Sequence, residues 1–247
     1  MKNLTVLALF ALCAAAQAAT EIEAGVSYDD LDSGRSSWNS HYLRGAHDFA
    51  PRLTLYGELR ETERFELDDT EISGGLYLPL SEAWTGLIEA SLSDTHRVLA
   101  KNSVYGQLRR GFAGGWGLSA GLRHSEYTAS ATDLLVLGVE RYWASWRAAY
   151  TFYSGRPEGA GSGAAHRVEL HRFYGERSSI GVSVAKGREV ENVGPPTGVI
   201  TSDVTSLVLV GRHWISPEWA FSYELHRVEQ GDLYNRNGLQ LGIRYRF

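Results

Sequence analysis

The chain has 247 residues, 27 of them glycine, and a formal net charge of −5 at pH 7. A mildly acidic balance argues against nucleic acid as a partner, because phosphate backbones attract basic surfaces. The sequence contains one cysteine, Cys13, and one methionine, Met1. Both lie in the leader described next, so no disulfide framework and no thiol nucleophile are expected in the mature protein.

Residues 1–18 predict a secretory signal peptide. A lysine at position 2 gives a positive start, an apolar or small run follows, and Ala16-Gln17-Ala18 has the small-x-small pattern of a cleavage site. Cys13 follows Leu12, where lipidation favours a small residue, so we expect no lipid anchor. The mature domain is expected to span residues 19–247.

Short turn-like segments recur along the chain about every 30 residues, with a last interval of about 40. Two strand-like runs and one more polar loop separate each neighbouring pair of turns. This repeat predicts seven hairpins, hence about fourteen strands, with twelve as the alternative count. The turns are residues 49–52, 79–82, 112–115, 143–145, 175–178 and 216–218.

The runs between turns alternate between apolar and polar residues. In residues 53–60, Leu53, Leu55 and Leu59 alternate with polar residues such as Glu58 and Arg60. Period two is typical of a β-strand with two different faces, and about ten residues suffice for a tilted strand to cross a bilayer. The sequence therefore predicts an all-β fold: a transmembrane antiparallel β-barrel of the bacterial outer membrane.

Aromatic residues mark the expected membrane boundaries. Tryptophans flank the short turns, which predicts an interfacial girdle at the periplasmic end; they are Trp84, Trp116, Trp143, Trp146, Trp214 and Trp219. The last residues form an apolar stripe that resembles the signal read by the bacterial barrel-assembly machinery: Leu239, Leu241, Ile243, Tyr245 and Phe247. The expected partners are that machinery during biogenesis, and outer-membrane lipids and lipopolysaccharide afterwards.

Charged residues on the opposite face are expected to line the lumen. The candidates are Glu58, Arg60, Glu89, Arg109, Arg123, Glu140, Arg147, Glu169, Glu224, His226, Arg244 and Arg246, and Glu23, Arg44 and Arg167 share their face. Rings of charge can set the selectivity of a water-filled pore. The same charges can instead pair and fill the barrel. Both interpretations stay open from the sequence.

We expect no catalytic centre, no cofactor and no metal. His124 and Ser125 are adjacent, so on a strand they face opposite sides. Residues 29–37 and 65–69 are expected to form the first two long loops. The acidic residues at positions 29–32 and 66–71 do not match a calcium-binding loop of the EF-hand type. No nucleophile elbow and no zinc-protease motif occurs in the sequence.

Several strand fragments together resemble the YaiO family of outer-membrane β-barrels: residues 121–123, 137–142, 211–214 and 231–247. The resemblance implies an outer-membrane location. Similar barrel domains follow helical repeat domains in some proteins, which links them to exopolysaccharide export, but this chain has no such repeat. The expected function is a narrow or gated diffusion pore for small hydrophilic solutes or saccharides. The alternatives are a non-conducting structural or adhesive barrel, and a lipid- or peptide-modifying enzyme.

Overall fold

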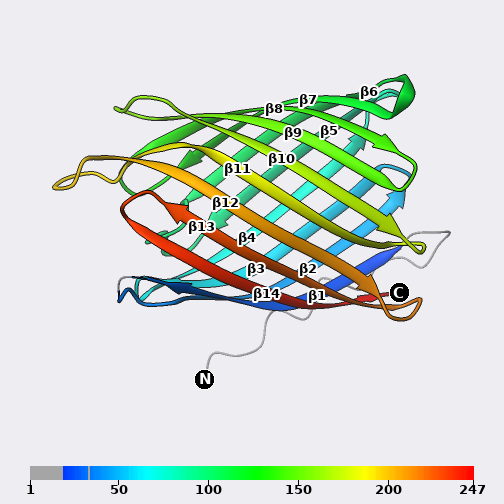
Figure 1. Ribbon diagram of the computed structural model, residues 1–247, viewed down its shortest axis with the longest axis horizontal. Helices are drawn as coiled ribbons and strands as arrows, with labels where there is room; N and C mark the ends of the chain where they lie inside the picture. The colour runs from blue at the N-terminus through cyan, green and yellow to red at the C-terminus, as the bar shows by residue number, and fades with distance from the viewer. Residues whose placement is uncertain (1–18, 33) are drawn as a thin grey trace.

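The computed structural model describes residues 19–32 and 34–247, which form one closed antiparallel β-barrel (Figure 1). Each strand pairs with its sequence neighbours, and β1 pairs with β14 to close the ring. The strands are β1 (Thr20–Leu31), β2 (Trp38–Ala50), β3 (Leu53–Arg64), β4 (Leu67–Pro79), β5 (Trp84–Ser93), β6 (Asn102–Gly111), β7 (Trp116–Glu126), β8 (Ala131–Trp143), β9 (Trp146–Pro157), β10 (Gly163–Tyr174), β11 (Ser178–Asn192), β12 (Val199–Trp214), β13 (Trp219–Gln230) and β14 (Tyr234–Arg246). The count of fourteen is confirmed. The expected signal peptide, residues 1–18, lies outside the described residues.

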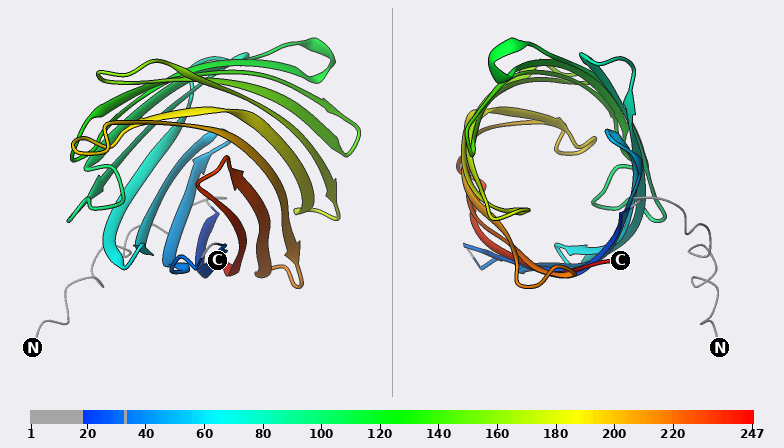
Figure 2. Two further views of the ribbon diagram at one scale, coloured as in Figure 1. Left: turned by 60° about the vertical axis from the view of Figure 1, so that its left-hand side comes forward. Right: turned by 90° about the vertical axis from the view of Figure 1, so that its right-hand side faces the viewer.

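The strands tilt across the wall, and the ring is seen nearly end-on in Figure 2 (right). One end carries six short connections, which coincide with the six turns expected from the sequence; one of them holds the 3-10 turn η1 (Ala113–Gly115). The C-terminal residue also lies at this short-turn end, where the Phe247 N–H donates to the Thr20 carbonyl over 2.9 Å. We call the opposite end the long-loop end.

One connection at the long-loop end is shorter than expected. The sequence suggests a loop over residues 65–69, but only Phe65 and Glu66 separate β3 from β4. Both residues have positive φ, 53° and 64°, as in the type I′ turns that match the twist of a hairpin. Asp68 and Asp69 therefore belong to β4, and they are not part of an acidic loop.

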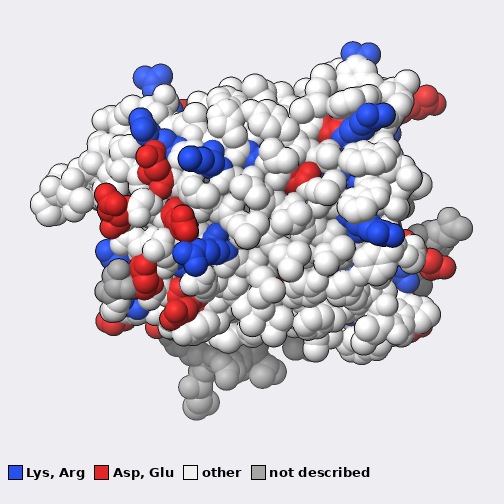
Figure 3. All heavy atoms as spheres, in the orientation of Figure 1, with Lys and Arg blue, Asp and Glu red and all other residues white. Residues whose placement is uncertain are grey.

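The outer face of the wall is apolar. Ile72, Leu92 and Leu122 are all more than 60% exposed, which suits a surface that contacts lipid. In Figure 3 the charged side chains gather toward the two ends of the barrel, and the wall between them is mostly free of charge. Within residues 19–32 and 34–247, no helix is long and apolar enough to span a membrane.

Inward-facing tyrosines fill space above glycines of the neighbouring strands. An added Cβ at Gly25 would lie 2.4 Å from the Tyr42 hydroxyl oxygen, and one at Gly121 would lie 2.6 Å from that of Tyr105. Only glycine permits this close approach, which pins the register of neighbouring strands. Tyr105 also joins Leu87 and Val136 in a small apolar cluster on the interior wall.

Candidate functional site

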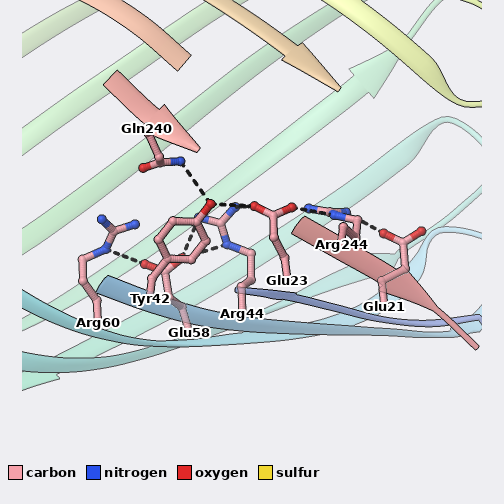
Figure 4. A network of polar contacts seen from close by, with 8 residues as sticks. All are labelled: Glu21, Glu23, Tyr42, Arg44, Glu58, Arg60, Gln240 and Arg244. Atoms are coloured by element: carbon pink, nitrogen blue, oxygen red, sulfur yellow. Dashed lines mark hydrogen bonds and ion pairs between the residues drawn. The ribbon is translucent and has the colours of Figure 1, made fainter. Parts of the chain in front are cut away.

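Ion pairs cross the join between the first and last strands on the interior face (Figure 4). Arg244 Nη1 lies 2.5 Å from Glu21 Oε2, and Arg244 Nε donates to Glu23 Oε2 over 2.7 Å. Glu23 is only 3% exposed and Arg244 8% exposed, so each charge depends on the other for compensation. We call the connected set the seam belt: Glu21, Glu23, Tyr42, Arg44, Glu58, Arg60 and Arg244.

The seam belt continues from β1 to β3. Tyr42 donates its hydroxyl to Glu23 over 2.8 Å. Arg44 lies 4.0 Å from Glu23 and donates from Nε to Glu58 over 2.7 Å. Arg60 donates to the other oxygen of Glu58 over 2.7 Å. Acids and arginines therefore alternate along the wall, as Figure 4 shows.

A second chain of ion pairs, the wall belt, covers the side of the interior formed by β6, β8, β9 and β10. Glu140 accepts from Arg109 and, over 2.7 Å, from Arg147 Nε. Arg147 also lies 3.7 Å from Glu169, which accepts from Arg167. Glu140 and Glu169 thus each lie between two arginines, so both carboxylates have their charge partners within the wall.

A shorter network lies between the belts on β3, β5 and β7. Glu89 accepts from Arg123 Nη2 and from the Tyr56 hydroxyl, each over 2.6 Å. Arg123 in turn stacks over the Tyr105 ring at 4.9 Å. Three networks therefore distribute paired charge around the interior wall.

The charge pairing changes toward the long-loop end. His226 lies 2.5 Å from Asp29 and 3.2 Å from Glu224. The Glu224 side chain is 39% exposed, against 4% for Glu23 in the seam belt. Asp29 was expected in the first loop, but it belongs to β1 and faces inward, because its strand continues to Leu31.

Two interior cavities lie in this half of the barrel. The larger, of about 940 Å³, extends from the long-loop rim at Ala129 and Val193 down to His171 and Ser183. The smaller, of about 300 Å³, lies around Trp38 and is called the Trp38 chamber. Both are lined by the same four residues at their boundary, Arg64, Ser206, Val208 and Glu224. The two cavities therefore adjoin in the interior of the barrel.

A buried carboxylate fixes one loop at the mouth of this space. Asp69 is 1% exposed and accepts from the backbone N–H groups of Arg97, Val98 and Leu99 over 2.7–2.9 Å. Residues 96–99 of that loop line the larger cavity. Beside it, the backbone N–H groups of Thr70 and Thr95 donate to Asp94 and hold its pKa below the usual range.

A second segment lies over the mouth from the opposite wall. The connection between β11 and β12, residues 193–198, leans across the opening in the end-on view (Figure 2, right). Ser130 Oγ donates to the Asn192 carbonyl and Asn192 Nδ2 donates to the Glu158 carbonyl, each over 2.9 Å. Three long-loop connections are thus tied together, which narrows the entrance.

Eleven of the twelve predicted lumen residues take part in the interior contacts described above, and the twelfth, Arg246, lies 3.7 Å from Glu21. Their role in conduction stays a prediction. The sequence reasoning missed further interior residues. Only their inward-facing positions in the strand alternation, or contacts with residues distant in sequence, identify them. They are Glu21, Asp29, Trp38, Tyr42, Arg64, Asp69 and Arg236.

All six predicted girdle tryptophans lie at strand ends next to the short turns. Arginines stack over four of them: Arg110 over Trp84, Arg141 over Trp116, Arg172 over Trp146 and Arg177 over Trp214. Trp214 departs from the girdle. It pairs with Ala220, which pairs with Arg244, so alternation puts it on the interior face, with Arg177 stacked over it.

The apolar stripe of β14 has the outward parity that was expected. Leu239, Ile243 and the terminal Phe247 are 39%, 60% and 69% exposed, while Leu241 and Tyr245 share their face in the register with β1. Recognition of this stripe by the assembly machinery stays a prediction.

The sequence predicts no catalytic centre, and the candidate pair His124 and Ser125 can be placed in the structure. His124 bonds to Asp133 over 2.7 Å on the exterior face, whereas Ser125 is buried and bonds to Ser103 over 3.1 Å. The two neighbours therefore face opposite sides of the wall. In the described part of the chain, no group of three or more metal-ligating side chains converges.

The barrel is similar in fold to outer-membrane proteins of known structure. An anion-selective porin from Comamonas acidovorans aligns with 12% identity and a TM-score of 0.51, covering 93% of this chain and 98% of its own. A loop deletion mutant of OmpT, an outer membrane protein of Vibrio cholerae, has 9% identity, a TM-score of 0.52 and coverages of 93% and 99%. A bacterial polysaccharide outer membrane secretin has 13% identity, a TM-score of 0.55 and coverages of 92% and 98%. These likenesses support the fold alone.

Comparison with curated proteins gives no match. The model of the YaiO membrane beta barrel domain matches residues 19–191. Two of the fragments that carried the resemblance, residues 211–214 and 231–247, lie outside that match. The matched residues cover well over half of the chain, and the closed barrel and its outer-membrane neighbours agree with them. The protein is an outer-membrane β-barrel that belongs to the YaiO family.

Proposed function

We propose that this barrel is a narrow diffusion pore for small hydrophilic solutes. The observation that carries the proposal is the pair of adjoining interior cavities, of about 940 and 300 Å³, the larger of which extends from the long-loop rim down to His171. Its lining includes Arg64, Glu169 and Glu224, so a solute inside it would meet charged groups and not an apolar wall. Such a lining suits solutes that carry hydroxyl or charged groups.

The two belts limit the size of the solute. Interior side chains such as Arg244 and Arg147 are each held by two ion pairs. Held side chains act as a fixed constriction, because moving one would leave a partly buried charge without its partner. The pore is therefore expected to pass ions and monosaccharides and to retard longer saccharides.

The rival function is a structural barrel that does not conduct. The fully paired charges of the belts favour it, since a network that satisfies itself can fill the lumen. Conduction separates the two functions directly. The purified protein is refolded, inserted into planar bilayers and recorded as single channels, with liposome swelling in sugars of increasing size as the second measurement.

A matched pair of variants assigns any conductance to this lumen. Ala185 lines the larger cavity, whereas its neighbour Val184 is 51% exposed on the exterior. Ala185→Trp is expected to lower the single-channel conductance by roughly half or more, and Val184→Trp to leave it unchanged. Heat-modifiable migration in gels checks that both variants fold. Silent bilayers with correctly folded protein, or equal conductance in both variants, would contradict the pore.

A further inference from the structure

The Trp38 chamber carries an unusual number of hydrogen-bond donors. Three arginines line it, Arg60, Arg64 and Arg236, together with Trp38 and Thr62. We propose that this chamber binds a small oxyanion: a carboxylate or phosphate group on a solute that enters the lumen. The proposal rests on the pore proposed above and narrows its solute class to anions.

Two of the arginines share one aromatic ring. The guanidinium carbon of Arg64 lies 4.8 Å from the centre of the Trp38 ring, and that of Arg236 lies 4.7 Å from it. Trp38 is itself held by edge contacts with Phe65 and Tyr234 at 5.1 and 5.7 Å, and it is 6% exposed. Stacking on a fixed ring holds both guanidinium groups beside the chamber without neutralising them.

Arg60 is paired with Glu58 over 2.7 Å, but the carboxylates nearby do not fully balance the charges of Arg64 and Arg236. Asp29 Oδ1 lies 3.6 Å from Arg236 Nη1, but the same oxygen lies 2.5 Å from His226 Nε2. Arg64 stacks over Trp38, and no carboxylate in residues 19–32 and 34–247 is within ion-pair distance of it. Glu224 also lines the chamber, but it faces His226 at 3.2 Å. Positive charge at Arg64 is therefore left for a ligand to compensate.

Polar atoms of residues that line the chamber also lack hydrogen-bond partners. Trp38 Nε1, Thr62 Oγ1 and Arg236 Nε are buried and have no hydrogen-bond partner among the described residues. Indole and guanidinium nitrogens donate only, so a group that satisfies them must supply acceptor oxygens. Buried donors without acceptors are costly, which favours a ligand that brings several oxygens at once. Carboxylate and phosphate groups do so and carry the compensating charge.

A solute can reach the chamber through the larger cavity. Arg64 and Glu224 line both spaces, so Arg64 stands at their boundary. An anion that enters the larger cavity therefore meets this arginine where the cavity adjoins the chamber. The arrangement favours capture of an anionic group at Arg64 and its transfer into the chamber beside Arg236.

Titration calorimetry of the refolded barrel in detergent micelles tests the site with three probes: glucuronate, inorganic phosphate and glucose. At least one of the two anions is expected to bind saturably, and glucose at least about tenfold more weakly. The tighter of the two anions identifies the oxyanion as carboxylate or phosphate. Arg64→Gln and Arg236→Gln are each expected to weaken anion binding about tenfold.

The control variant is Arg227→Gln, which removes one arginine from the same half of the barrel. Arg227 pairs with Glu229 at 3.2 Å and is 58% exposed, away from the chamber. Its anion affinity should match that of the parent. Trp38→Phe keeps a ring and removes the indole donor, so it should weaken anion binding without loss of heat-modifiable migration.

Equal binding of glucose and both anions, no binding of any probe, or unchanged affinity in Arg64→Gln, Arg236→Gln and Trp38→Phe would overturn the site. Titration in micelles does not require a conducting barrel, so the proposed anion site and the proposed pore are tested by independent measurements. Conduction without anion binding would remove the site and keep the pore. Anion binding by a barrel that does not conduct would remove the pore and keep the site.

Discussion

In the short-turn half of the interior, Glu23 lies between Arg244 and Arg44, and Glu140 lies between Arg109 and Arg147. In the long-loop half, Arg64 contacts an aromatic ring and the described residues leave Trp38 Nε1 without an acceptor. One half therefore satisfies its charges internally, and the other keeps donors available beside open space. Paired charges hold neighbouring strands together, whereas unpaired donors beside a cavity are available to hydrogen-bond a ligand.

The largest expected effect comes from removing the central arginine of the seam belt. Arg244→Ala leaves Glu23 charged, 3% exposed and without its closest partner, which should lower the free energy of unfolding by about 3–5 kcal/mol. Urea unfolding in micelles measures the loss. Arg246→Ala is the control, because Arg246 is 32% exposed and lies 3.7 Å from Glu21, so about 1 kcal/mol or less is expected. Equal losses in the two variants would show that the seam belt does not stabilise the short-turn half.

A glycine beneath the seam belt should give the next largest effect. At Gly25, a Cβ would lie 2.4 Å from the Tyr42 hydroxyl and 2.5 Å from the Leu241 carbonyl oxygen. Gly25→Ala should therefore cost about 2–3 kcal/mol of stability by displacing Tyr42. At Gly106 on the exterior, an added Cβ has no atom within 4 Å, and Gly106→Ala should change stability by about 0.5 kcal/mol at most. Urea unfolding of the two variants side by side checks the contrast, and a tolerated Gly25→Ala would count against close packing at the seam.

The contact between Asp69 and the loop at residues 96–99, in the long-loop half, should contribute less to stability than the seam belt. It holds one loop and does not hold strands of the wall together. Asp69→Ala leaves three backbone N–H groups without an acceptor, and we expect about 1–2 kcal/mol of local stability to be lost. Limited trypsin digestion should then cut faster at Arg97 and Lys101. Asp68→Ala is the control, since Asp68 is exposed and only pairs with Arg97 at 3.0 Å. Unchanged digestion of the Asp69 variant would mean that the loop is held by other contacts.

The smallest effect on stability is expected at Glu224. Its side chain is 39% exposed to the interior space, and Glu224→Ala leaves His226 paired with Asp29. Stability should change by about 0.5 kcal/mol or less, because water solvates the groups that remain. In a conducting barrel, loss of this carboxylate should raise the selectivity for anions over cations, measured as a shift of the reversal potential in a salt gradient. A large loss of stability would show that the long-loop half is as tightly paired as the seam belt.

The wall of the barrel could be predicted from the sequence because it depends on a local rule. Side chains alternate between two faces, so residues 53–60 reveal one lipid-facing and one lumen-facing set without knowledge of any other strand. The regular spacing of the turns then gives the number of strands. Trp214 shows the limit of inference from turn position, because its face depends on the register of β12 with β13.

The interior networks depend on contacts that alternation alone does not specify. Arg44 meets Glu58 because the two residues are directly opposed in the register of β2 and β3. Asp69 holds a loop about 30 residues further along, and an Asp-Asp pair in the sequence suggests a solvated loop instead. The Trp38 chamber draws on β1, β2, β3, β12, β13 and β14, so no local pattern marks it.

The seam belt has a consequence for how the chain finds its closed form. The strand that supplies Glu21 and Glu23 is the first of the barrel, and the strand that supplies Arg244 is the last. A slip of one residue in any hairpin between them would carry through to β14 and turn Arg244 to the lipid side. Its acidic partners would then stay inside without compensation. When β1 and β14 pair, the charges of Arg244, Glu21 and Glu23 are therefore compensated only if every preceding hairpin is in the correct register.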